Sequence, residues 1–146
     1  MTGENRTDPK WARSRKGNFH RFIYLRPSSE GLDKVSGIYV VWHGGLKPEW
    51  ITVGKSANLG RALETLADDE DVEYYENRGG VFVTWSQIRP EFQDGVLKYL
   101  IETLDLLTPP DKLPAKNIEA IPVYPPGLEP RAVAPKAPTN TVTPPS

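Results

Sequence analysis

Two short apolar runs joined by a glycine-rich connection constrain the fold of this chain more than any other feature of its sequence. Residues 37–42 (GIYVVW) and 50–53 (WITV) are rich in the β-branched and aromatic residues that favour strands. The connection at 44–49, GGLKPE, carries turn-forming Gly and Pro. The sequence therefore predicts a β-hairpin with a loop longer than the tightest type, after which GKSANL at 54–59 ends the second strand and opens a helix.

The remaining apolar periodicity predicts a small α/β (α+β) domain. Leu59, Leu63 and Leu66 recur at helical spacing and predict a helix over 57–67. A second leucine-rich stripe predicts a helix over 93–107, and the alternating VFVTWS at 81–86 predicts a third strand. A short strand is expected at 22–25, and the acidic run at 68–76 is expected to be a solvated loop. The expected fold is a small three-stranded, mainly antiparallel sheet (36–42, 50–54, 81–86) flanked by helices.

Composition indicates a compact centre between two less ordered ends. The chain has 146 residues, of which 38% are apolar and 15 are Pro, and many of the prolines lie after residue 121. We expect a flexible basic arm at 1–19, one domain at 20–121 and a Pro-rich disordered tail at 122–146. With no Cys and two His, disulfides, thiol catalysis and Cys- or His-rich metal sites are excluded. The sequence has no long apolar run and a polar start, so a cytoplasmic protein without a membrane span is expected.

Four features occur in an order typical of one enzyme family. They are GIY at 37–39, TVGKS at 52–56, NL at 58–59 opening a helix, and Glu102 on a later helix. Over residues 36–117 this set resembles the GIY-YIG nuclease family. The resemblance implies a GIY-YIG nuclease-like fold and hydrolysis of phosphodiester bonds in DNA.

The resemblance also implies roles for individual residues. Tyr39 would orient or deprotonate the attacking water, and Arg61 is the candidate for the helix arginine that stabilises the phosphate. Glu102 would hold one divalent ion, Mg²⁺ or Mn²⁺, if the domain is catalytically active. These roles meet the needs of phosphodiester hydrolysis, which are a nucleophilic water and positive charge at the phosphate.

Two positions depart from the family pattern, and they leave two functions open. Thr52 stands where the family usually has Tyr, and Ala62 stands where its helix arginine is expected, one residue after Arg61. The chain is either a metal-dependent endonuclease or a catalytically impaired GIY-YIG-like module that binds nucleic acid or a protein partner. Judged without the resemblance, Tyr39 reads as a core aromatic and Glu102 as part of a solvated helix face.

Basic residues near the start of the chain are candidates for contacts with phosphates. Arg13, Arg15 and Lys16 lie in the basic arm, and Lys55 follows the second hairpin strand. The expected partner is nucleic acid, with DNA favoured, and the Pro-rich tail could bind a protein partner. A nucleotide-binding P-loop is excluded, because position 49 is Glu where that motif needs Gly.

Overall fold

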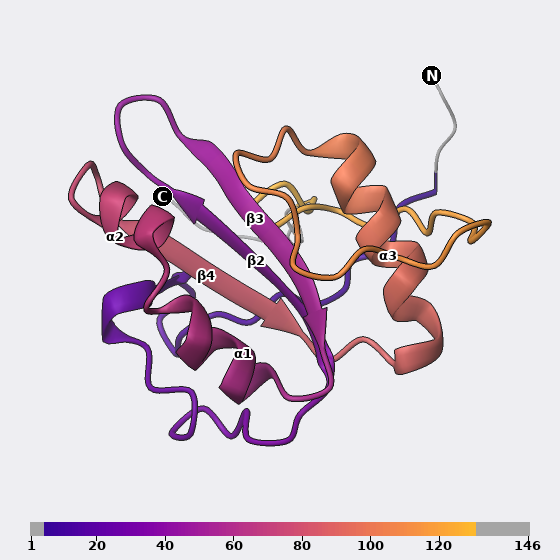
Figure 1. The fold of residues 1–146 in the computed structure, drawn as a ribbon, viewed down its shortest axis with the longest axis horizontal. Helices are drawn as coiled ribbons and strands as arrows, with labels where there is room; N and C mark the ends of the chain where they lie inside the picture. Colours follow the sequence, from indigo (N-terminus) through magenta and orange to yellow (C-terminus); the bar gives the residue numbers. More distant parts are fainter. Residues whose placement is uncertain (1–4, 131–146) are drawn as a thin grey trace, which may run out of the picture.

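The computed structural model describes residues 5–130, which form one α+β domain (Figure 1). Its elements, in chain order, are β1 (His20–Arg21), the 3-10 helix η1 (Phe22–Tyr24), β2 (Gly37–His43), β3 (Glu49–Ser56), α1 (Leu59–Leu66), α2 (Glu70–Glu76), β4 (Val81–Ser86) and α3 (Pro90–Thr103). The predicted hairpin, the third strand and the two predicted helices are all present. The predicted antiparallel α+β architecture is thus confirmed.

The sheet has four strands in the order β1-β4-β2-β3, and every neighbouring pair is antiparallel. The prediction of three strands is wrong, because His20 and Arg21 pair with Val83 and Phe82 of β4. Two residues are too short to show an alternating pattern, so only their partner strand reveals them. The strand expected at 22–25 is instead the single turn η1.

A β-bulge interrupts the pairing of β2 with β3. Val41 pairs with Thr52 but Trp42 pairs with Trp50, which leaves Ile51 without a partner across the ladder. A bulge bends its strand and redirects side chains. Consequently Ile51 packs with the core on one face of the sheet, while Val53 packs with the core on the other.

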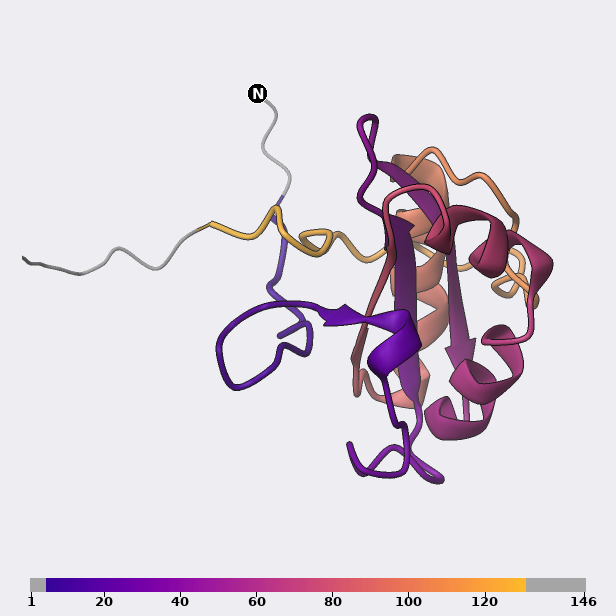
Figure 2. The same cartoon turned by 90° about the vertical axis from the view of Figure 1, so that its left-hand side faces the viewer.

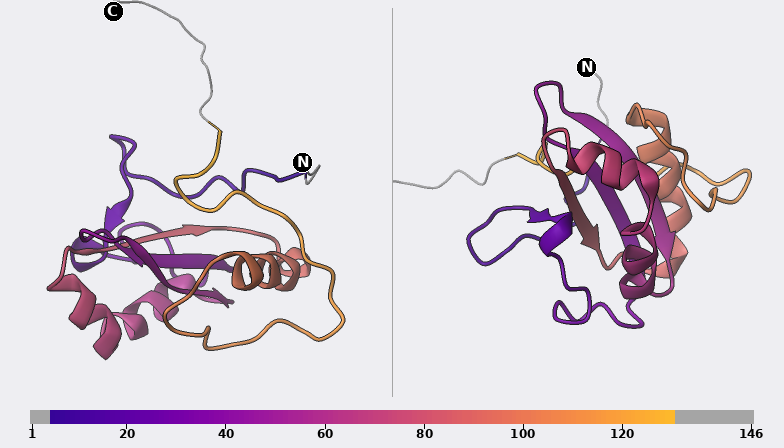
Figure 3. Two further views of the ribbon diagram at one scale, coloured as in Figure 1. Left: turned by 90° about the horizontal axis from the view of Figure 1, so that it is seen from above. Right: turned by 60° about the vertical axis from the view of Figure 1, so that its left-hand side comes forward.

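Two hydrophobic clusters cover the two faces of the sheet. One lies under α1, α2 and η1 and includes Tyr39, Leu63 and Val72. The other lies under α3 and includes Ile38 and Leu100. Figure 3 shows α1 and α2 together on one side of the sheet. Both candidate binding sites described below lie on that α1/α2 face.

Helix α2 replaces the solvated loop that the acidic run predicted. The side chain of Asp69 accepts a hydrogen bond from the backbone N–H of Asp71 and so caps the helix. Glu70, Asp71 and Glu73 lie in the first turn, where the helix dipole favours negative charge. Acidic residues that repel one another in a loop therefore stabilise the start of this helix.

Helix α3 ends at Thr103, before the predicted end at 107. The chain then runs along the outer edge of β3, where the N–H groups of Leu107 and Thr108 donate to the carbonyl groups of Trp50 and Ile51 at 3.0 and 2.8 Å. These bonds satisfy backbone groups of an edge strand. We call residues 104–112 the edge segment.

The described parts of both chain ends lie against the domain. Figure 2 shows the first and last described segments beside each other. Thr7 bridges Val123, and the buried Trp11 donates its Nε1–H to the carbonyl of Tyr124 at 2.7 Å. Ala12 bonds to the backbone of β4. Each segment thus supplies the other with partners, which the sequence analysis did not predict; the flexible arm at 1–19 and the Pro-rich disordered tail at 122–146 stay predictions. Residues 1–4 and 131–146 of those predicted ends lie outside the described residues. No helix in the described chain is long and apolar enough to span a membrane.

Candidate functional site

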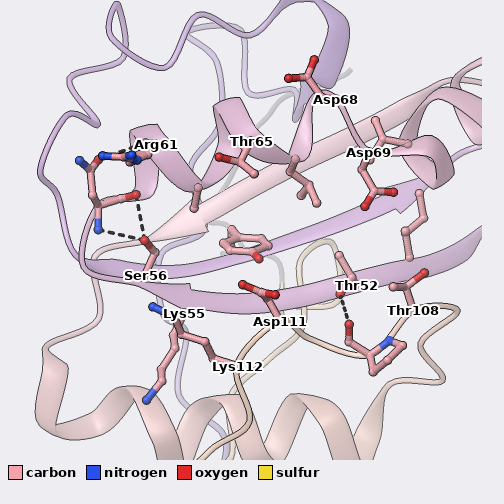
Figure 4. Close-up of a pocket in the computed structure, with 17 residues that line it drawn as sticks. Thr52, Lys55, Ser56, Arg61, Thr65, Asp68, Asp69, Thr108, Asp111 and Lys112 are labelled. Carbon is pink, nitrogen blue, oxygen red and sulfur yellow. Dashed lines mark hydrogen bonds between the residues drawn. The ribbon is translucent and has the colours of Figure 1, made fainter.

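A cleft of about 540 Å³ opens between the hairpin, α1 and the edge segment (Figure 4). It brings together Tyr39, Lys55 and Arg61, three of the residues singled out from the sequence. The other lining residues are Ile51, Thr52, Ser56, Asn58, Ala62, Thr65, Leu66, Asp68, Asp69, Val72, Thr108, Pro109, Asp111 and Lys112. We refer to this site as the cleft.

Tyr39 is deeply buried in the cleft and is 6% exposed. Its ring lies over Gly54, its partner on β3, so closely that any side chain at Gly54 would collide with the phenol. Burial raises the pKa of Tyr39, and the negative charges of Asp111 and Asp69 raise it further. The phenol therefore stays protonated near neutral pH. It can donate a hydrogen bond to a ligand, but it is poorly suited to remove a proton from water.

The start of α1 forms one end of the cleft. Asn58 accepts a hydrogen bond from the backbone N–H of Arg61 at 3.1 Å and so caps the helix. Ser56 supports this turn by bonding to the backbone of Asn58. Arg61 and Ala62 both line the cleft. The family's helix arginine is expected at position 62, where this chain presents only the methyl group of Ala62 to the cleft.

Lys55 is directed toward α3 rather than into the cleft. It pairs with Ile38, which packs under α3, and its Nζ donates to Asp94 Oδ1 at 2.5 Å. This hydrogen bond holds the pKa of the Asp94 carboxyl below its usual value. Lys55 contributes to the wall of the cleft, but its charge is already paired. The charge that the sequence assigned to phosphate binding thus links β3 to α3.

The remaining charges divide the cleft into two ends. Figure 4 shows Arg61 and Ser56 at one end, Asp68 and Asp69 at the other, and Asp111 between them. Lys112 lies with the basic end, and both Arg61 and Lys112 are exposed. Neither cation forms an ion pair within residues 5–130. An anionic group therefore fits the Arg61 end and is repelled from the Asp69 end.

Three lining residues of the edge segment were missed by the sequence analysis. Thr108, Asp111 and Lys112 follow a helix and flank a Pro-Pro pair, a context typical of a plain surface loop. They reach the cleft because the edge segment pairs with β3. Thr108 also donates to Asp71 at 2.9 Å and links the segment to α2. No local pattern signals these long-range contacts.

Glu102 does not join the cleft. It lies exposed on α3, and within residues 5–130 no three His, Asp or Glu side chains are placed to hold a metal ion. Mg²⁺ is usually held by one or two protein carboxylates, and waters and substrate phosphates complete its oxygen ligands. Because Glu102 lies outside the cleft that holds Tyr39 and Arg61, the three residues do not form one centre, and we derive no catalytic step through a metal.

The basic residues of the arm also lie outside the cleft. Arg13 stacks on Phe19 at 3.9 Å and pairs with Glu129 at 3.5 Å. Arg15 and Lys16 are exposed on the same loop and do not line the cleft.

No family model, curated protein or solved structure matches this chain.

Proposed function

We propose that this domain is a GIY-YIG-like module that binds the phosphate backbone of nucleic acid, with DNA favoured, and does not hydrolyse it. One observation carries the proposal. The segments that resemble the family supply Tyr39, the capped turn at Asn58 and Arg61 to a single cleft, while Glu102 lies elsewhere. Binding groups are thus gathered without the metal-binding group.

The chemistry of the basic end supports binding of a phosphate. Among residues 5–130 neither the guanidinium of Arg61 nor the ammonium of Lys112 forms an ion pair. Guanidinium and ammonium groups form strong charge-assisted bonds to phosphate oxygens. The protonated phenol of Tyr39 is a third donor in the same cleft.

The acidic end limits the length of strand that the cleft can hold. A backbone that crossed the whole cleft would meet Asp68, Asp69 and Asp111. The fit is therefore best for a strand end or a sharply bent strand, with one or two phosphates near Arg61. Two neutralised phosphates on a single strand predict a slope of about −1.4 for log K against log salt.

Binding is tested by fluorescence anisotropy with labelled single-stranded and duplex DNA, each with and without a terminal phosphate. Arg61→Gln and Lys112→Gln should each weaken binding about tenfold, which corresponds to roughly 1.4 kcal/mol. The matched control is Lys47→Gln, which removes the same charge from the exposed tip of the hairpin. Equal losses in all three variants would show that the cleft is not the binding site.

Metal-dependent hydrolysis is the second candidate function, favoured by the presence of Tyr39 and Arg61 in one cleft. Incubation of supercoiled, branched and single-stranded DNA with Mg²⁺ or Mn²⁺ separates the two functions. Cleavage that is lost in both Tyr39→Phe and Glu102→Ala would establish the enzyme and overturn the binding-only proposal. We expect no cleavage that depends on these two residues.

A further inference from the structure

A second hollow lies on the other side of α1 from the cleft. It also has a volume of about 540 Å³ and is bounded by η1, the end of α1 and α2. Phe22, Leu25, Leu63 and Val72 line it and are at most 8% exposed. Ile23, at its edge, is 48% exposed. We call this site the groove.

The groove combines apolar lining with an acidic rim. Residues 64–76 include seven carboxylates and no Lys or Arg. Of the three that line the groove, Glu76 is paired with Arg21 at 2.6 Å. Glu64 and Glu73 are exposed and form no ion pair among the described residues. Among the residues that the structure describes, Arg26 is the one cation lining this groove, so the carboxylates of Glu64 and Glu73 remain available to a ligand.

These charges exclude some ligands and favour others. The acidic rim repels phosphates, so neither a nucleic-acid strand nor an anionic lipid surface is complementary to it. The apolar lining and the exposed Ile23 are typical of a surface that binds an apolar side chain. A ligand that satisfies both features is apolar at its centre and positively charged around it.

We propose that the groove is a docking site for a cationic peptide segment of a protein partner. Leucine-sized side chains of the segment would fill the hollow above Leu63 and Val72. Flanking Lys or Arg side chains would lie against Glu64 and Glu73. This site is separate from the cleft and does not depend on the function proposed for it.

The test uses a labelled peptide, KRLKKLLKR, titrated into the full chain at physiological salt. One comparison peptide has Ser in place of each Leu, and another has Glu in place of each Lys and Arg. Saturable binding of the first peptide alone is the expected result. A Ser peptide that binds equally well would overturn the proposal, because binding would then depend on charge alone and not on the Leu side chains.

Variants then locate the binding. The double variant Glu64→Lys/Glu73→Lys should weaken binding at least about tenfold, since two attractive pairs become repulsive. The matched control, Asp105→Lys/Glu119→Lys, makes the same charge change at exposed positions outside the groove. Circular dichroism and the melting temperature verify that both variants fold. Equal losses in the two variants would contradict the assignment.

Ala67→Trp provides a readout independent of charge. Ala67 is exposed and lines the groove, so an indole there should occupy the hollow and block the peptide. Undiminished binding in this variant would overturn the proposal.

Leu46 is fully exposed at the hairpin tip beside Lys47 and offers a competing occupant, a second copy of the chain. Self-association that is lost in Leu46→Ser would assign the groove to that copy instead of a partner.

Discussion

The cleft and the groove lie on opposite sides of α1 and have the same volume, yet they differ in the charged residues that line them. Arg61, Ala62 and Thr65 line the cleft, whereas Glu64 and Ala67 line the groove. Since successive helical residues are rotated by about 100°, one eight-residue helix can serve two sites. The comparison shows that two hollows of equal size beside one helix can present different charges to a ligand.

The largest expected effect comes from changing Gly54 to Val. The new side chain collides with the ring of Tyr39, so we expect a loss of about 3 kcal/mol in the free energy of unfolding. Binding of a DNA strand at the cleft should be lost, while binding of the cationic peptide at the groove should persist in the fraction of the protein that remains folded. Urea denaturation and the two binding assays measure these effects. Ala57→Val, at a nearby exposed position, is the control and should leave all three unchanged.

Two matched arginine substitutions, one in the cleft and one in the groove, test whether the two sites bind different ligands. Ala62→Arg places a cation in the cleft and should raise affinity for a DNA strand about fivefold. Ala67→Arg places the same cation in the groove and should lower affinity for the cationic peptide by a similar factor. Anisotropy titration of both variants with both ligands is the measurement. If either arginine changed both affinities equally, the two sites would not be distinct.

The ion pair between Lys55, which lines the cleft, and Asp94 predicts that the stability of the fold depends on pH in acid. The folded protein lowers the pKa of Asp94, so the stabilisation is present above the ordinary value of 3.8 and is lost as the pH falls through the lowered pKa. Asp94→Asn should therefore reduce stability by about 1 kcal/mol at pH 7. The difference from the parent protein should shrink in acid. A constant difference across that pH range, measured by denaturation, would contradict this account.

The smallest effect on stability is expected from the ionisation of Tyr39 at alkaline pH. Because the folded state raises the pKa of Tyr39 above 10.0, its contribution to stability is present below that value and declines as the pH rises through the higher folded pKa. Tyr39→Phe should remove this decline, with little change at neutral pH. Melting temperatures measured between about pH 9 and pH 11 provide the test. Tyr24→Phe, at a tyrosine that is 72% exposed, is the control.

Local sequence patterns were informative wherever an element is defined by its own residues. The hairpin and the third strand could be predicted because β-branched and aromatic residues cluster there, and α1 because its leucines recur at helical spacing. The grouping of Tyr39 with Arg61 was implied by the resemblance to the nuclease family and not by these local patterns. The two-residue β1, helix α2 and the placement of Trp11 could not be predicted, because each depends on a partner far away or on a helix cap.

By itself, the sequence determined the order of the main elements and the residues of the hairpin and α1, because short-range periodicity encodes them. Only the tertiary structure decided which charges meet. It paired Lys55 with Asp94, left Glu102 on an exposed surface of α3 and brought Asp111 and Lys112 to the cleft through the edge segment. The physical reason is that electrostatic interactions depend on distances in space, which chain packing sets and sequence separation does not.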